Sequence, residues 1–365
     1  MTDPTLPSDP APASRTEPPP SRPIRLAPTY PALVDAWPWA RPFLLNGGVE
    51  RGQFHPLGAA ALVFVGAFVL FQGIGAVAMG IGLAIRMAQA DDFSMDIETL
   101  LVENGDVVLV GNTIGQWLGF ALLAALMARW STPDWKEFLR ARRPDWAGLG
   151  LAALGWAAFY PLVLWLGELN KSLPLPEWAR EMDVQQGDAM EMLLMGAELP
   201  TWFLFIAVAI TPAVCEELMF RGYLQRQVER GLGLGWSIGL VGVLFGAYHL
   251  QPSNLLPLSA LGVYLGFVVW ATGSVWTGTL VHFLNNGIAV LMVAYARTRP
   301  DLDLEAIEAA GIPWYFPVVG LIFTPPLVYG LLRRRRQVVG DTPDAAPVEP
   351  DDSFALSTAS SPAHV

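Results

Sequence analysis

Long apolar runs separated by polar segments dominate the pattern of this chain. A helix needs about 20 consecutive, predominantly apolar residues to cross the hydrocarbon core of a bilayer. Eight runs approach that length, and the fifth and sixth are the shortest of them. They are, approximately, residues 57–85, 107–130, 147–167, 200–222, 234–250, 255–272, 275–296 and 314–332. The pattern therefore predicts an all-α, polytopic membrane protein with about eight transmembrane helices.

The composition supports the same class of protein. Hydrophobic residues make up 53% of the 365 positions, charged residues make up 15%, and the mean hydropathy is +0.40. A soluble domain of this length would be less apolar. The net charge of −11 says little about a partner, because it comes mostly from acids in loops and tails. We expect no nucleic-acid partner. The single Cys215 excludes an internal disulfide, and we interpret it as a small buried hydrophobe.

The distribution of basic residues predicts the orientation in the membrane. With a cytoplasmic N-terminus and eight spans, the cytoplasmic segments hold 17 of the 22 Lys and Arg residues, as the positive-inside rule requires. We expect an integral membrane protein, in the inner or plasma membrane if the chain is bacterial, with both termini cytoplasmic. Residues 1–50 are predicted to be a disordered tail with a juxtamembrane segment, and residues 337–365 a second disordered tail. Residues 51–336 then form the transmembrane domain.

Two adjacent carboxylates, Glu216 and Glu217, stand at the end of an apolar run, with Arg221 four residues after the second. A charge at membrane depth costs about 2.5–3.5 kcal/mol on insertion scales, so such a cluster normally has partners or a function. On a helix Glu217 and Arg221 share one face, whereas Glu216 points about 100° away. We predict that Arg221 neutralises Glu217 and leaves Glu216 free as a general base. The alternative is an interfacial salt bridge at a helix end.

A histidine in the fifth run is predicted to face Glu216. Gly231 and Gly233 mark a turn between the fourth and fifth runs, and this turn lies midway between Glu216 and His249 in sequence. A helical hairpin turning there would set both side chains at equal height, about 24 Å from the turn. The alternative for His249 is a lone buried histidine bonded to a carbonyl.

The seventh run carries three further polar residues, His282, Asn285 and Asn286. His282 and Asn286 are four residues apart and share one helix face, whereas Asn285 points about 100° away. Such residues can also tie transmembrane helices together by hydrogen bonds. We favour that role for Asn285 and a functional site for His282 and Asn286.

Three motifs thus follow one another on apolar runs: Glu-Glu-x-x-x-Arg at 216–221, Phe-x-x-x-His at 245–249 and His-x-x-x-Asn at 282–286. With all three complete, the chain resembles the CPBP family of intramembrane proteases. That family, formerly called the Abi family, includes the type II CAAX prenyl endopeptidases and bacterial relatives that process bacteriocins or confer self-immunity. The resemblance covers roughly residues 195–300 and implies that the last five helices form the catalytic core of an endopeptidase.

The resemblance also implies roles for the motif residues. In the family, the residues matching Glu216 and His249 are thought to activate a water for attack on a peptide carbonyl. The residues matching His282 and Asn286 are thought to stabilise the oxyanion. The implied partners are membrane lipids and a membrane-associated protein or peptide substrate. No Ser-His or Cys-His arrangement indicates a covalent acyl-enzyme.

The resemblance leaves the cofactor open. Family members have been labelled metalloproteases, although a glutamate-based mechanism without metal is also advocated. Glu216, His249 and His282 could ligate zinc or another divalent metal, with water as the fourth ligand. The chain has no His-Glu-x-x-His segment, and each ligand would come from a separate helix. We therefore favour a metal-independent site and predict no firm cofactor.

The surroundings of the motifs add three expectations. The second acidic position and the basic position, Glu217 and Arg221, are expected to support the site structurally. The break at 251–254, directly after His249, is either a non-helical lining of the site or a plain extracytoplasmic turn. Residues 174–195 are either an interfacial helix that covers the site from outside or a connecting loop.

Two other functions fit the same residues. A secondary transporter could use Glu216, His249 and His282 as a proton relay, and a non-catalytic membrane regulator could bind a partner protein. A transporter of this kind should carry an internal repeat, but the first half of the chain holds no second Glu-Glu motif. The complete motif set favours the enzyme.

Overall fold

The computed structural model describes residues 45–90, 103–196, 199–299, 301 and 311–339, and the regular structure within these ranges is all helical. Helices are expected because a backbone in hydrocarbon has to satisfy its N–H and C=O groups internally. Among the described residues, seven helices are long and apolar enough to cross a membrane. The prediction of a polytopic all-α membrane protein is confirmed. The two predicted tails lie almost wholly outside the described residues.

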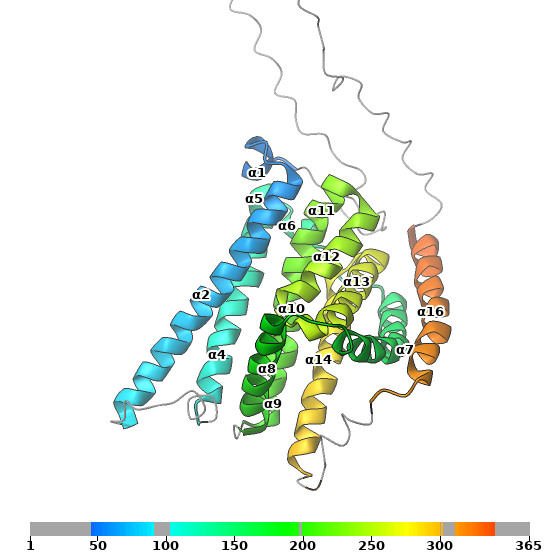
Figure 1. The fold of residues 1–365 in the computed structure, drawn as a ribbon. Coiled ribbons are helices and arrows are strands. Elements are labelled where there is room, and N and C mark those ends of the chain that lie inside the picture. Colours follow the sequence, from blue (N-terminus) through cyan, green and yellow to red (C-terminus); the bar gives the residue numbers. More distant parts are fainter. Residues whose placement is uncertain (1–44, 91–102, 197–198, 300, 302–310, 340–365) are drawn as a thin grey trace, which may run out of the picture.

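Figure 1 shows the described helices in their spatial arrangement. In chain order they are α1 (Gly48–Arg51), α2 (Pro56–Ala90), α4 (Gly105–Gln116), η2 (Trp117–Leu122), α5 (Leu123–Ser131), α6 (Trp135–Phe138), α7 (Trp146–Lys171), α8 (Glu177–Glu191), η3 (Met192–Gly196), α9 (Thr201–Leu204), η4 (Phe205–Ile210), α10 (Thr211–Glu217), η5 (Leu218–Leu224), α11 (Gln225–Leu232), α12 (Leu234–Tyr248), η6 (Pro252–Asn254), α13 (Leu255–Thr272), α14 (Val275–Arg297) and α16 (Tyr315–Val339). The segments η2, η3, η4 and η5 are π-helical, and η6 is a 3₁₀ turn.

The fifth predicted span differs from a full transmembrane helix. It corresponds to α12, which has only 15 residues and is therefore about 22 Å long. A hydrocarbon core is about 30 Å thick. The helix stops at His249 because Pro252, shortly after it, has no N–H to continue the hydrogen-bond ladder. The fifth run, predicted to be marginal in length, is thus a short apolar helix beside the seven longer ones found among the described residues.

The fourth span is one continuous rod, Thr201–Leu232, in which α-helical and π-helical segments alternate. A π-helical turn widens the helix locally and often marks a functional position. Glu216 and Glu217 end α10, directly before the π-helical η5. The rod ends at Gly233, whose φ of +84° favours glycine, and α12 begins at once. The predicted hairpin turn is confirmed.

Glycines bring α2 and α4 into backbone contact. Gly111, Gly115 and Gly119 recur every fourth residue and face α2. A Cβ on Gly115 would lie 2.6 Å from the Phe71 carbonyl oxygen, and one on Gly119 would lie 2.5 Å from the Phe71 nitrogen. Small residues at this spacing allow transmembrane helices to approach closely. The glycine row therefore fixes the distance and the rotation of α4 against α2.

Substitution of Gly115 by leucine is expected to push α4 off α2 and to destabilise the protein by about 1–3 kcal/mol, because the added side chain meets backbone atoms that cannot yield. Thermal unfolding in detergent measures the effect. Gly73→Leu on α2 is the matched control, since a Cβ there meets no atom within 4 Å. Equal stability of the two variants would contradict the close contact.

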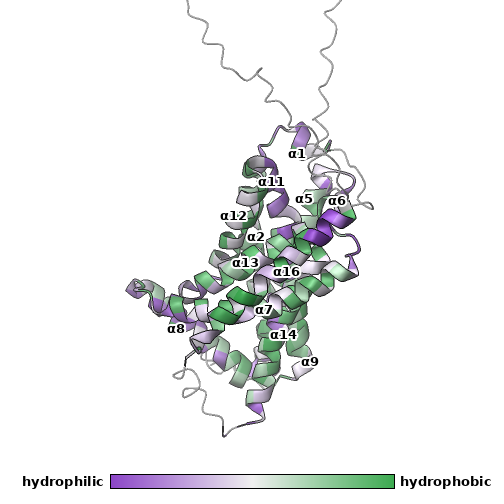
Figure 2. Cartoon of the chain, turned by 90° about the vertical axis from the view of Figure 1, so that its right-hand side faces the viewer, coloured by the Kyte–Doolittle hydropathy of each residue, from purple (hydrophilic) through white to green (hydrophobic). Residues whose placement is uncertain are grey.

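One end of the bundle gathers the polar and basic groups. α1, α11 and the C-terminal end of α16 lie at the same end in Figure 1, and Figure 2 shows hydrophilic residues on α1, α6 and α11 there, above a largely hydrophobic middle. Three ion pairs of 2.8 Å connect segments at this end. They are Arg140–Glu229, Arg230–Glu50 and Arg334–Asp145.

Candidate functional site

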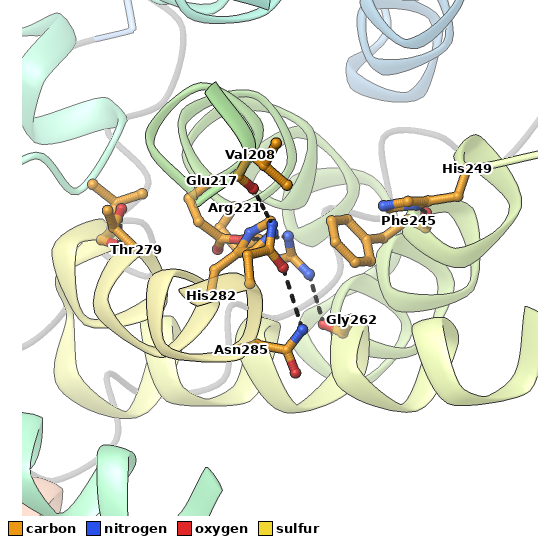
Figure 3. A network of polar contacts seen from close by, with 11 residues as sticks. Val208, Glu217, Arg221, Phe245, His249, Gly262, Thr279, His282 and Asn285 are labelled. Atoms are coloured by element: carbon orange, nitrogen blue, oxygen red, sulfur yellow. Dashed lines mark hydrogen bonds and ion pairs between the residues drawn. The ribbon is translucent and has the colours of Figure 1, made fainter. Parts of the chain in front are cut away.

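The carboxylate of Glu217 lies in a fully buried polar network. Arg221 donates a hydrogen bond of 2.6 Å from Nη1 to Oε1 of Glu217, and His282 Nδ1 lies 3.1 Å from the same oxygen. Arg221 also donates to the Gly262 carbonyl oxygen at 3.1 Å (Figure 3). Both side chains of the Glu217–Arg221 pair are completely inaccessible to solvent. The predicted neutralisation of Glu217 by Arg221 is present in the structure.

Helix α14 lacks a side chain at the point where it meets the Glu217 carboxylate. Gly278 on α14 lies one turn before His282, and a Cβ added there would stand 2.6 Å from Glu217 Oε2. α14 can therefore approach α10 only because residue 278 has no side chain. The approach brings His282 within hydrogen-bonding distance of Glu217.

Glu216 points the other way, as the helix geometry predicts. It lines a cavity of about 440 Å³, and His249 lines the same cavity. Its Oε2 atom is buried and has no hydrogen-bond partner among the described residues. A carboxylate oxygen in this state can accept a hydrogen bond from a bound molecule. The structure thus brings Glu216 and His249 to one cavity.

His249 is held in one orientation. It follows the last residue of α12, and its Nδ1 lies 2.8 Å from the carbonyl oxygen of Phe245, one turn earlier. A carbonyl oxygen only accepts hydrogen bonds, so Nδ1 carries a proton here, and Nε2 is an acceptor in the corresponding neutral tautomer. The side chain is half-buried, so this nitrogen can serve a ligand in the cavity.

The ring of Phe245 separates the cavity histidine from the buried network. The Arg221 guanidinium lies 4.3 Å from the centre of the Phe245 ring, and the His249 ring lies edge-to-face with it at 4.8 Å. Figure 3 shows Phe245 between Arg221 and His249. The His282 ring also packs on Phe245, at 5.7 Å between ring centres. The motif phenylalanine therefore divides the motif residues into two groups.

His282 and Asn286 belong to the buried side of this division. His282 is 2% exposed and bonded to Glu217. Asn286 donates to the Val208 carbonyl oxygen of the π-helical η4 at 3.1 Å. Neither side chain lines the cavity of Glu216 and His249. Asn285 accepts a hydrogen bond from Trp156 on α7 at 3.4 Å, which is the interhelical contact expected for it.

The arrangement does not fit a three-ligand metal site. Glu216 and His249 lie on the cavity, whereas His282 is bonded to Glu217 on the far side of Phe245. Within the described part of the chain, no group of three or more His, Cys, Asp or Glu side chains is placed to hold a metal ion. The candidate zinc ligands are therefore not gathered in this conformation.

Only the first residue of the break at 251–254 lines the cavity, and Pro252–Asn254 form a 3₁₀ turn. Leu250, with a φ of +54°, and Gln251 are both part of the cavity lining. The Leu250 carbonyl oxygen accepts from Gln186, and the Pro252 carbonyl oxygen accepts from Asn170 at 2.9 Å. Side chains thus satisfy the irregular backbone, as is required at membrane depth.

Most of residues 174–195 form a helix, α8 continued by η3, that lines the cavity and is not a connecting loop. α8 and η3 contribute Gln186, Met190 and Leu193 to the cavity lining. Asp183 on α8 accepts a hydrogen bond of 3.0 Å from the Ser253 amide, and Gln186 donates to Leu250 at 3.0 Å. The interpretation as a covering helix agrees with these contacts.

Besides Gln186 and Gln251, four lining residues have polar side chains that the motifs do not include. Gln72 on α2 and Asn112 and Gln116 on α4 face the cavity, together with Tyr248 beside His249. The three carboxamides could have been noticed in the sequence, because they stand inside otherwise apolar runs. The Tyr248 ring packs edge-on against the rings of Phe64, Phe68, Phe120 and Phe220.

Comparison with protein families supports the resemblance. Residues 198–288 match the model of a family described as type II CAAX prenyl endopeptidase Rce1-like. The three motifs at 216–221, 245–249 and 282–286 all lie within the matched stretch. The predicted resemblance to CPBP and CAAX proteases is thereby confirmed. Comparisons with curated proteins and with solved structures found no match.

Proposed function

We propose that this membrane protein is an endopeptidase in which Glu216 activates a water for direct attack on a peptide bond of a membrane-associated protein or peptide. The observation that carries the proposal is the separation of the two adjacent glutamates. Glu217 is fully buried with Arg221, whereas Glu216 lines a 440 Å³ cavity with His249. One carboxylate is structural, and the other is free to take a proton.

The chemistry needs a base, an orienting partner and a route for the proton. Glu216 accepts a proton from the water as its oxygen attacks the carbonyl carbon, and the peptide C=O becomes an oxyanion. His249 accepts a hydrogen bond at Nε2 from the second O–H of the water and so orients the nucleophile, and that hydrogen stays on the attacking oxygen. The protonated Glu216 then transfers its proton to the leaving nitrogen as the C–N bond breaks.

For His282 and Asn286 we propose a positioning role in this mechanism. His282 holds Glu217, the neighbour of the base, and Asn286 holds the Val208 carbonyl in the cavity wall. Of the donors in the lining, the Tyr248 hydroxyl is buried without a hydrogen-bond partner among the described residues. We propose that this hydroxyl donates to the oxyanion, because preorganised donors are most effective where charge develops.

We further propose that both termini are cytoplasmic and that membrane lipids surround the bundle. The gathering of Arg140, Arg230 and Arg334 at the end that holds α1 and the C-terminal end of α16 supports this orientation. His249 lies at the far end of α12 from the turn at Gly233. The cavity then belongs to the half of the membrane remote from the cytoplasm.

The test compares the protein termini in membranes of the native host. Strains expressing the wild type, Glu216→Gln and His249→Ala at equal levels are analysed for new N- and C-termini. We expect one set of termini to disappear in both variants, and to persist in Glu103→Gln, an exposed acid distant in sequence from the motifs. If no terminus depends on Glu216 or His249, the protein is not a protease of this kind.

A further inference from the structure

A row of carboxamides faces the catalytic pair from helices that lie outside the family match. Gln72 on α2 and Asn112 and Gln116 on α4 line the same cavity as Glu216 and His249. The matched stretch begins at residue 198. This wall is therefore a feature of the chain's own first two spans.

The row of glycines at 111, 115 and 119 determines where the carboxamide side chains of α4 point. Gly111 and Gly115 lie against the backbone of α2, and Asn112 and Gln116 each follow one of these glycines. Successive residues on a helix are rotated by about 100°, and residues four apart share a face. The contact that closes α4 onto α2 therefore directs both carboxamides into the cavity.

The cavity lining contains polar atoms that have no hydrogen-bond partner among the described residues. Gln116 is only 6% exposed, and its Oε1 has no hydrogen-bond partner among the described residues. Glu216 Oε2 and the Tyr248 hydroxyl, also in the lining, share this state. Buried polar groups in proteins are nearly always hydrogen-bonded. Three orphaned groups in one cavity indicate a polar ligand that bonds to them.

The chemistry of the row fits a peptide main chain. A carboxamide both donates and accepts hydrogen bonds, as does each main-chain amide. Asn112 and Gln116 are separated by about 6 Å along the helix axis, and alternate residues of an extended chain are separated by about 6.6–6.8 Å. A substrate unwound for cleavage needs such partners, because its main-chain N–H and C=O groups no longer bond to each other within a helix.

We propose that Asn112 and Gln116, assisted by Gln72, form a substrate-positioning site. It binds the main chain of an extended peptide segment and holds the scissile carbonyl at Glu216. This inference rests on the proposed function. Since the row recognises main-chain groups, it tolerates many side-chain sequences in the segment it binds.

The experiment uses the purified full-length protein in lipid nanodiscs and a peptide of about ten residues around a cleavage site mapped in the host. Asn112→Leu and Gln116→Leu are each expected to raise KM about 5- to 10-fold with kcat little changed, as the loss of one main-chain hydrogen bond implies. Gln116→Asn should recover part of the loss. Thr113→Val, on the same helix but outside the cavity lining, is the matched control.

Depsipeptides identify the contact directly. In these peptides an ester replaces one main-chain amide and removes its N–H. At one position the ester should raise KM for the wild type but not for Gln116→Leu, because the variant has already lost the acceptor. Equal effects at every position in both proteins, or an unchanged KM in both leucine variants, would overturn the positioning site.

The two proposals fail in different ways. If Glu216→Gln changes no terminus in the host, the protease function fails, and this inference fails with it. If Glu216→Gln removes termini while the leucine variants keep the wild-type KM, only the positioning site is wrong. Thermal unfolding of each variant distinguishes a lost contact from a lost fold.

Discussion

Replacing Glu216 with glutamine is expected to lower kcat by about 10²- to 10⁴-fold, the usual contribution of a positioned general base, and to leave the fold intact. Glutamine has the same shape but cannot take a proton from water. The carboxylate makes no hydrogen bond at Oε2 that the fold depends on. The measurement is turnover of the mapped peptide in nanodiscs, combined with thermal unfolding of the same preparation.

The neighbouring residue provides the sharpest comparison for this variant. Glu217→Gln removes the charge that pairs with the fully buried Arg221. Its main effect should therefore be a lower unfolding temperature and not a lower kcat. Glu103→Gln, at an exposed position, should change neither property. Full turnover by Glu216→Gln would show that another residue is the base.

Replacing Arg221 with methionine is expected to destabilise the protein by about 3–5 kcal/mol, since breaking a buried ion pair leaves one charge uncompensated. Arg221 is inaccessible to solvent and holds both Glu217 and the Gly262 carbonyl oxygen. In the variant, His282 remains as the partner of Glu217. The free energy of unfolding in mixed micelles measures the loss.

Two further variants test the cause of this destabilisation. The double variant Glu217→Gln/Arg221→Met should recover much of the loss, because no unpaired charge stays buried. Arg299→Met removes an exposed ion pair with Asp301 and should leave the free energy of unfolding nearly unchanged, because solvent screens such pairs. An Arg221→Met protein as stable as Arg299→Met would contradict the network as described.

The sequence was sufficient for the parts of the fold that local rules determine. Helical periodicity placed Arg221 on the face of Glu217 and turned Glu216 away, and the glycines at 231 and 233 located the hairpin. These features depend on residues within one helix or one turn. The length of α12 was overestimated, because hydropathy alone does not show where Pro252 and the preceding residues end a helix.

The parts of the site that depend on packing between distant helices were harder to foresee. His282 belongs to the same motif set as Glu216 and His249, but Gly278 lets α14 approach so closely that His282 reaches Glu217 rather than the cavity. Gln72, Asn112 and Gln116 belong to no motif, and only the glycine contact between α2 and α4 brings them opposite Glu216. Side-chain volume across a helix interface is not visible in a one-dimensional pattern.

The shortness of α12 has a consequence for the surrounding bilayer. A helix of about 22 Å is roughly 8 Å shorter than the hydrocarbon that it would have to cross. Such hydrophobic mismatch is relieved by local thinning of the bilayer. Such thinning would bring headgroups and their water closer to His249 than a full-length helix would allow. Under the proposed function, it would shorten the path of the hydrolytic water to the cavity of Glu216 and His249.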